Sequence, residues 1–250
     1  MSGFFAFVGR ALGESLDNWR SALFRMLFQP LVYLLVFGKI LGRALPDSGY
    51  SLVVAPGIVS MLVMSAALSN IGGILTRGYY FRSMESWLLA PLTLRCLMLA
   101  WITGTVLIAT IAGLIGNLLV YGLLGYMPLS LSANLVCLVY GATIFSLLGC
   151  IGYTLPQTPA KAQDFIAFLL MPMMFLGCTF FSYSMLPEPW NIVALLMPTT
   201  YLSEALRIVY GSHSSTLDLA FIAGGGIGAL LLLFVIADWS FRRRFRDFLW

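Results

Sequence analysis

Charged residues are scarce in this sequence. Asp, Glu, Lys and Arg together make up only 10% of the 250 residues, while hydrophobic residues make up 60%. Soluble domains carry about 25% charged residues, because a folded chain in water must cover its core with a polar surface. The scarcity of charge therefore excludes an ordinary soluble domain and indicates an integral membrane protein.

Histidine and lysine are the rarest of the chemically useful residues. His213 is the only histidine, which excludes a His-based metal cluster. Lys39 and Lys161 are the only lysines, and neither stands in a G-x-x-x-x-G-K-[ST] phosphate loop, so any ATP must bind another chain. The cysteines form no C-x-x-C pair and are expected to pack as small apolar residues. They are Cys96, Cys137, Cys150 and Cys178.

Long apolar runs dominate what is present. A membrane-spanning helix needs roughly 20 apolar residues. Positions 1–9 carry no basic residue and no A-x-A site follows, so no cleavable signal peptide is expected. No repeat or linker interrupts the chain, which predicts a single membrane domain over residues 1–250. Six segments qualify or come close: Leu23–Leu41, Leu52–Leu75, Leu97–Leu124, Leu131–Leu155, Phe165–Phe181 and Leu217–Trp239.

The basic residues predict the orientation of these spans. With six spans, both ends of the chain lie on the same side of the membrane. Eleven of the 14 basic residues then fall on that side, leaving Lys39, Arg43 and Arg207 on the other. Because cytoplasmic loops carry an excess of Lys and Arg, both ends are expected in the cytoplasm.

The segment before the first span predicts an amphipathic helix, placed within residues 1–22. Phe5, Val8, Leu12, Leu16 and Trp19 recur every three or four residues and share one helical face, and charged residues occupy the opposite face. Such a helix is expected to lie in the membrane interface. It is either an elbow that also touches a partner or a simple anchor.

The longest cytoplasmic connection, residues 76–97, predicts a short helix that ends before Pro91. Ser83 can cap its first turn, where the helix dipole favours the negative charge of Glu85. Met84, Trp87 and Leu88 then share one face. So short a helix is unstable alone and must dock, either on its own bundle or on a cytoplasmic partner.

The external segment, residues 183–213, is broken by Pro187, Pro189 and Pro198. Two short helical pieces remain, Trp190–Met197 and Thr200–Tyr210, and neither is long enough to cross a membrane. A re-entrant hairpin that gates the transport path is one interpretation, and a surface loop is the other. Glu204 and Arg207, three residues apart, are expected to form a local ion pair. The candidate gate residues are Pro187, Trp190, Pro198, Tyr201, Glu204 and Arg207.

With these segments placed, the chain resembles the type-2 ABC transporter permeases, a family of nodulation-factor, polysaccharide and drug exporters. Four strings carry the resemblance. FQPLVYLLVFGKILG and APGIVSMLVMS open the first and second spans, ESWLLAPLTLR lies in the cytoplasmic loop, and LPEPWNIVALLMPTTYLSEALR lies before the last span. Thr179 departs from the family pattern, which prefers a smaller or aliphatic residue there.

The resemblance implies an all-α membrane fold with six spans, an N-terminal amphipathic helix, a cytoplasmic coupling helix and a re-entrant pair. It implies a multi-pass protein of the bacterial inner membrane that pairs with a second copy or a homologous permease. Two copies of a cytoplasmic ATPase subunit would bind ATP and Mg²⁺, so this chain would hold no cofactor and would not itself be an enzyme. No nucleic-acid partner is expected. The residues that would contact the ATPase are Arg82, Ser83, Met84, Glu85, Trp87 and Leu88.

The function expected from this resemblance is export of a bulky amphipathic, lipid-linked or glycolipid-like substrate or a drug. An ion-coupled transporter or channel is the alternative, but such proteins keep ionisable residues inside the bilayer, and these spans offer almost none. A lipid-modifying enzyme needs clustered His, Asp or Glu, whereas the acids here are scattered. The G-x-G-x-x-A string at residues 224–229 lies inside the last span, where Gly224 and Gly228 predict a helix contact within the chain or across a dimer.

Overall fold

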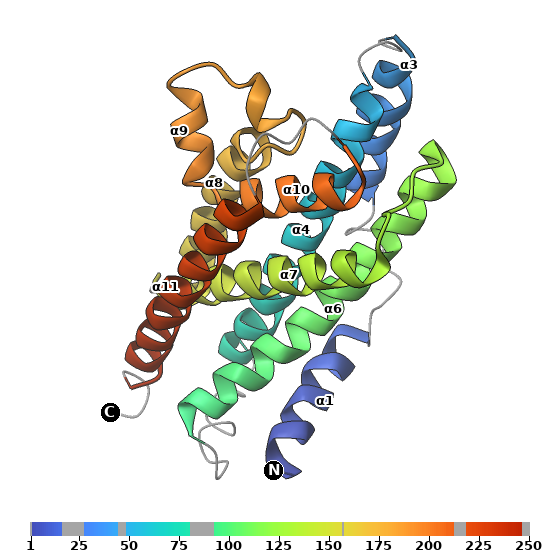
Figure 1. The fold of residues 1–250 in the computed structure, drawn as a ribbon. Coiled ribbons are helices and arrows are strands. Elements are labelled where there is room, and N and C mark those ends of the chain that lie inside the picture. The colour runs from blue at the N-terminus through green and yellow to red at the C-terminus, as the bar shows by residue number, and fades with distance from the viewer. Residues whose placement is uncertain are drawn as a thin grey trace.

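The computed structural model describes residues 2–16, 28–44, 49–80, 93–156, 158–212 and 219–246, and every regular element among them is helical (Figure 1). Residues 28–33 are α-helical and continue into the π-helix η1. The elements are α1 (Ser2–Leu16), η1 (Leu34–Leu41), α3 (Gly42–Ala44), α4 (Tyr50–Tyr80), α6 (Leu94–Leu124), α7 (Leu131–Thr154), α8 (Pro159–Leu176), η3 (Tyr183–Met185), α9 (Trp190–Leu195), α10 (Pro198–Val209) and α11 (Leu219–Arg246).

Four helices of the described residues, α4, α6, α7 and α11, are long and apolar enough to cross a membrane. They coincide with four of the predicted spans. Local chemistry sets several of the ends. The Thr93 hydroxyl accepts from the Cys96 amide at the start of α6, and Gly125 closes that helix at φ 78°, a conformation that glycine adopts without steric cost.

In the first predicted span the described residues 28–41 are helical, and most of the fifth is helical as well, but neither helix is among those four. The fifth was expected over Phe165–Phe181, whereas α8 covers Pro159–Leu176. It begins earlier because the Thr158 hydroxyl accepts from the Lys161 amide and Pro159 suits a first helical turn. It ends earlier at Gly177, because the chain there turns toward α10.

Helix α4 lies at the centre of the bundle. It packs against α6, α7, α10 and η1, and 83% of the residues in its most apolar 18-residue stretch are buried. Its sequence is apolar all round, which is typical of a helix surrounded by other helices. The start of α1 and the end of α11 lie in the lower part of Figure 1, and α3 and α9 lie toward the upper edge.

An apolar cluster fills the lower end of the bundle, between α4, α6, α7 and α11. Trp101 of α6 contacts Phe241 of α11 edge to face, with 5.7 Å between the ring centres. Phe241 stacks on Phe245 at 4.3 Å. An aromatic pair of this geometry contributes about 0.5–1.5 kcal/mol beyond its buried area, so the Trp101–Phe241 contact helps to hold α6 against α11.

The predicted N-terminal helix is present as α1, which packs mainly along α6. Val8 is buried, Leu12 is partly buried, and Phe5 is 69% exposed, so only part of the predicted apolar face contacts the bundle. Leu16 belongs to the helix, but its side chain lies outside the described residues, as does Trp19. The helix is confirmed, and its place in a membrane interface stays a prediction.

The predicted coupling helix, with Arg82, Ser83, Met84, Glu85, Trp87 and Leu88, lies outside the described residues.

In α11 the small residues do make contacts, but not the ones expected. A Cβ at Gly225 would meet the Tyr201 ring and one at Gly226 would meet the Tyr140 ring, whereas Gly224 and Gly228 have no neighbour within 4 Å. The expectation of a contact through Gly224 and Gly228 within the chain is therefore wrong.

Candidate functional site around Glu204 and Arg207

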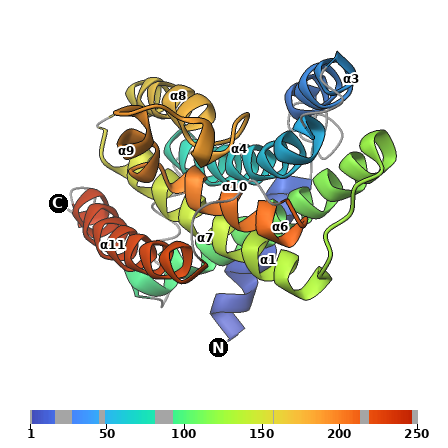
Figure 2. The ribbon, with the colours of Figure 1, turned by 45° about the horizontal axis from the view of Figure 1, so that its top comes forward.

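Helix α10 forms the centre of the site. It begins with Pro198 in its first turn and lies across the bundle, in contact with α4, α7, α8, α9 and α11 (Figure 2). Thr199 to Arg207 are almost entirely buried, apart from Tyr201, which is partly buried. A helix this short is held by its neighbours rather than by its own hydrogen bonds.

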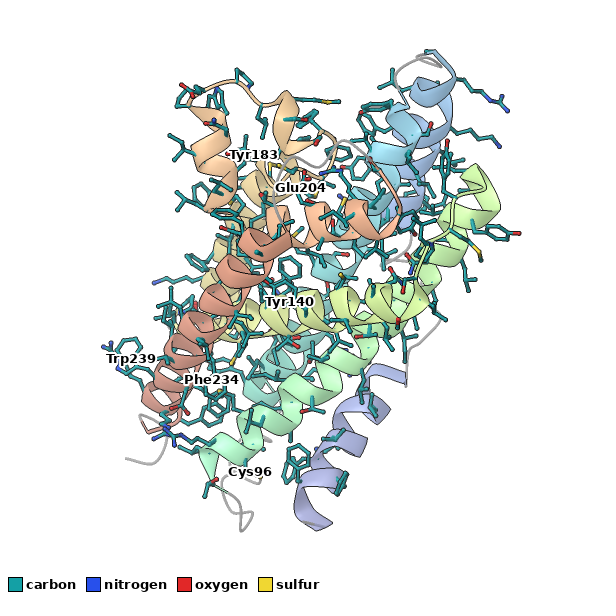
Figure 3. All side chains as sticks on the ribbon, viewed as in Figure 1. Cys96, Tyr140, Tyr183, Glu204, Phe234 and Trp239 are labelled. Carbon is teal, nitrogen blue, oxygen red and sulfur yellow. The ribbon has the colours of Figure 1, made fainter. Side chains whose placement is uncertain are left out.

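Glu204 and Arg207 form an ion pair with no solvent exposure on either side chain. Nη1 of Arg207 lies 2.6 Å from Oε1 of Glu204. The same carboxylate oxygen accepts a hydrogen bond of 2.9 Å from the backbone amide of Tyr183, and Figure 3 shows Tyr183 and Glu204 close together. A buried charge is tolerated only when it is paired and hydrogen-bonded, and both conditions hold here.

The other donors of Arg207 bind backbone carbonyls from two distant segments. Its Nε donates to the Val53 carbonyl in the first turns of α4, at 3.0 Å. Its Nη2 donates to the carbonyl of Cys178 and, at 3.5 Å, to that of Thr179. One guanidinium therefore joins α4, α10 and the chain that follows α8.

The sequence of α4 makes room for this arrangement. Pro56 has no N–H to donate to the Leu52 carbonyl, one turn earlier in the helix. The backbone hydrogen bonds of α4 are therefore interrupted next to Val53. Gly57 follows directly, and a Cβ at that position would collide with the Thr179 carbonyl. The two residues let the chain after α8 lie directly against the backbone of α4.

Hydroxyl groups along α10 fix the helix to the same segments. Thr199 donates to the Met173 carbonyl at 3.0 Å, and Ser203 donates to the Gly177 carbonyl at 3.1 Å. Tyr201 donates to the Leu195 carbonyl at 2.9 Å, which ties α10 to α9. The bonds to Gly177 and Leu195 satisfy carbonyls at the ends of α8 and α9, whereas the Met173 carbonyl also accepts from the Gly177 amide.

The site has a balanced charge and little chemical reactivity. Oε2 of Glu204 and the Thr179 hydroxyl are buried without a hydrogen-bond partner. No group of three or more His, Cys, Asp or Glu that could hold a metal ion occurs in the described part of the chain. The arrangement is suited to holding three segments in one position, not to acid–base or metal chemistry.

The structure brings together four of the predicted gate residues. Pro198, Tyr201, Glu204 and Arg207 belong to one packed helix, and the predicted ion pair is confirmed. Pro187 is exposed and Trp190 is 50% exposed, so both lie at the surface and away from the pair.

Sequence reasoning missed the partners of Arg207: Val53, Cys178 and Thr179. The only signal was the Pro56–Gly57 step, which interrupts an otherwise regular span. Arg207 is buried, so it is not one of the loop charges from which orientation is predicted, and the predicted external set is reduced to Lys39 and Arg43.

Comparison with known proteins gives consistent matches. A family model described as "ABC-2 type transporter" matches residues 3–210. The chain is 23% identical over 232 residues to "Inner membrane transport permease YadH" of Escherichia coli (strain K12), covering 91% of this chain and 90% of that protein. It is 27% identical over 148 residues to "Heme exporter protein B" of Pseudomonas aeruginosa (strain PAO1), covering 59% of this chain and 66% of that protein.

Proposed function

Because the chain belongs to the ABC-2 type transporter family, we propose that it is the membrane-spanning permease subunit of an ATP-driven exporter. The family match over residues 3–210 is the observation that carries the proposal. Permeases of this family work with a separate ATPase subunit. The absence of a phosphate loop in the full sequence agrees with a chain that binds no nucleotide itself.

In the proposed assembly, two permease chains, identical or homologous, meet in the inner membrane, and two ATPase subunits bind ATP and Mg²⁺ on the cytoplasmic side. Each permease has six spans, the first in residues 23–41 and the fifth formed by α8. The 18 residues of α8 extend about 27 Å, close to the thickness of the hydrocarbon layer. Both ends of the chain lie in the cytoplasm, together with residues 81–92.

Transport in this proposal is mechanical. ATP closes the ATPase pair, which pushes the helix around Trp87, and the bundle tilts between inward- and outward-facing states. Helices α9 and α10 form the external gate. Since Arg207 ties α10 to α4 and to the chain after α8, these segments would move as one rigid body when the gate opens.

The proposed substrate is bulky and amphipathic, such as a lipid-linked or glycolipid-like molecule or a drug. The membrane-spanning helices support this, because α7 contains no charged residue and α4 and α6 carry theirs only near one end. The buried charges of Glu204 and Arg207 neutralise each other, so they offer no pathway to a cation. The relative named as a heme exporter carries, by that name, an amphipathic cargo.

The test is substrate-stimulated ATP hydrolysis by the permease co-purified with its ATPase and placed in lipid nanodiscs. We expect Trp87→Ala and Glu85→Ala to abolish stimulation while the purified complex still elutes as one species. Phe168→Ala, which removes a 79% exposed aromatic side chain from α8, outside both the coupling segment and the proposed gate, is the control and should keep stimulation. Full stimulation in both loop variants would contradict the coupling mechanism, and transport driven by a proton gradient without any ATPase would contradict the exporter assignment.

A further inference from the structure

Helix α10 lies alongside α7, as Figures 1 and 2 both show. Near the start of α10, the side chain of Leu202 lies so close to α7 that a Cβ at Gly141 would collide with it. Near the end of α10, the Val209 carbonyl accepts a hydrogen bond of 2.9 Å from the amide of Leu129, in the turn before α7. The two helices are therefore antiparallel, and Tyr210 lies beside the first turn of α7.

Helices α6 and α7 are also antiparallel neighbours, joined by a short turn. A Cβ at Gly113 of α6 would collide with the side chain of Leu138 of α7. One helical turn further along α6 lies opposite one helical turn earlier in α7, since both helices rise by the same amount per residue. Asn117 of α6 therefore faces Asn134 of α7, at the place where Tyr210 also lies.

These three side chains form a buried polar cluster whose hydrogen bonds are incomplete. Tyr210 is 3% exposed, Asn117 is 8% exposed and Asn134 is fully buried. The Tyr210 hydroxyl donates to Oδ1 of Asn117 at 2.8 Å. Both polar atoms of Asn134 are buried without a hydrogen-bond partner among the described residues. A buried amide without a partner destabilises the state that contains it, so Asn134 is better suited to a different arrangement of these helices.

The contacts of α10 differ in strength from one neighbour to another. Arg207 ties α10 to α4 and to the chain after α8 through charge-assisted hydrogen bonds. The bond from Tyr210 to Asn117 of α6 is neutral on both sides. Neutral hydrogen bonds are about half as strong as charge-assisted ones, so the contact with α6 breaks more readily than the contacts of Arg207. A displacement of α10 against α6 and α7 then brings the hydroxyl to a new acceptor.

We propose that the Tyr210 hydroxyl is a two-position latch for α10, which donates to Asn117 when the gate is closed and to Asn134 when it is open. The proposal rests on the proposed function, because that function assigns α10 to the gate. One hydrogen bond replaces another, so the hydroxyl is paired in both states. Asn134 is unpaired in this structure because it is the acceptor of the other state.

The experiment measures how often α10 separates from its neighbours. Ala205 of α10 is 7% exposed, so a cysteine at this position reacts with a maleimide while the helix is displaced. The full-length permease carries Ala205→Cys, has its four native cysteines replaced, and is placed in lipid nanodiscs without an ATPase. The rate of labelling then reports the fraction of time that α10 spends in the open position.

The two asparagines should have opposite effects on this rate. We expect Asn134→Leu to slow labelling on the order of fivefold, because it removes the acceptor of the open state. We expect Asn117→Leu to speed labelling on the order of fivefold, because it removes the acceptor of the closed state. Leucine keeps the branched shape of asparagine in both variants. An unchanged rate in Asn134→Leu would overturn the proposal.

Tyr210→Phe separates the latch from a simple effect of buried polarity, since it removes the donor from both positions. With phenylalanine at this position, we expect Asn134→Leu to have no further effect on labelling. If Asn134→Leu slows labelling equally with tyrosine and with phenylalanine, water and not Tyr210 pairs with Asn134 on opening, and the proposal is wrong. This comparison does not need Asn117→Leu, so the test holds even where that variant fails to fold.

Thr110→Val is the matched control. It removes another buried hydroxyl without a partner among the described residues, on α6 and about 10 Å from Asn117 along the helix. Labelling at the wild-type rate supports the latch, whereas slowing equal to that of Asn134→Leu overturns it, because loss of any buried polar atom would then steady the bundle. The assay contains no ATPase, so its failure leaves the exporter assignment untouched. Failure of the ATPase assay contradicts that assignment and leaves the exchange between the two asparagines as measured.

Discussion

Arg207 has no contact with solvent, and its donors are directed at one carboxylate and three backbone carbonyls. Taking a guanidinium out of water costs several kcal/mol, and well-placed partners are needed to offset that cost. The residue is therefore retained for what it holds together. A neutral side chain would be cheaper to bury but could not bind carbonyls from α4 and from the chain after α8.

Replacement of Arg207 by Met should therefore destabilise the protein more than loss of one contact suggests. The variant leaves Glu204 as an unpaired buried carboxylate, which typically costs about 3–5 kcal/mol. We expect a clear fall in the apparent Tm, measured by thermal unfolding of the purified protein in detergent.

The double variant Arg207→Met, Glu204→Gln should recover part of this loss. Glutamine still accepts the hydrogen bond from the Tyr183 amide but carries no charge. Arg43→Met, at an exposed position, is the matched control and should leave Tm unchanged. A double variant that unfolds as early as Arg207→Met alone would mean that the lost carbonyl contacts, not the stranded charge, carry the effect.

At the scale of elements, the close contact of α4 with the chain after α8 gives a second prediction. Gly57→Ala would place a methyl group against the Thr179 carbonyl, which cannot move without breaking its contact with Arg207. We expect a loss of about 1–3 kcal/mol, the usual cost of overpacking, seen as a lower apparent Tm.

Gly73→Ala in the same helix is the control for this prediction. A Cβ at Gly73 meets nothing within 4 Å, so the substitution should be neutral or stabilise the helix by about 0.5–1 kcal/mol. If Gly57→Ala unfolds at the same temperature as Gly73→Ala, the approach of the two backbones is looser than described.

The elements also differ in how far sequence alone could define them. The spans that became α4, α6, α7 and α11 were predicted because about 20 apolar residues in a row have few alternatives. The Glu204–Arg207 pair was predicted because residues three apart share a helix face. The carbonyl partners of Arg207 were not predicted. Every residue has the same backbone carbonyl, so residue type does not indicate which one Arg207 binds, and the contacts join positions more than 25 residues apart.

At the scale of the whole molecule, the Arg95–Asp238 pair connects the start of α6 with the last turns of α11. Asp238 accepts from both Arg95, at 3.1 Å, and Arg242, at 3.0 Å. Arg95 is 63% exposed, so this pair adds little stability. Among the described basic residues, Arg77, Arg95 and Arg242–Arg244 lie at the end of the bundle that holds this pair, whereas Lys39 and Arg43 lie in η1 and α3 toward the other end.

This asymmetry predicts that the two ends of α7 lie on opposite sides of the membrane. The helix has 24 residues and so extends about 36 Å, enough to cross a hydrocarbon layer of about 30 Å even when tilted. Met127, in the turn before α7, and Ala160, at the start of α8, are both exposed. Single cysteines at these positions, with the four native cysteines replaced, report the side that each end faces.

We expect a membrane-impermeant maleimide to label Met127→Cys in intact cells and to label Ala160→Cys only after the membrane is opened, since the basic end of the bundle belongs in the cytoplasm. Equal labelling of both positions in intact cells would mean that α7 does not cross. Labelling in the reverse order would place residues 81–92 outside the cell, where an ATPase could not reach them.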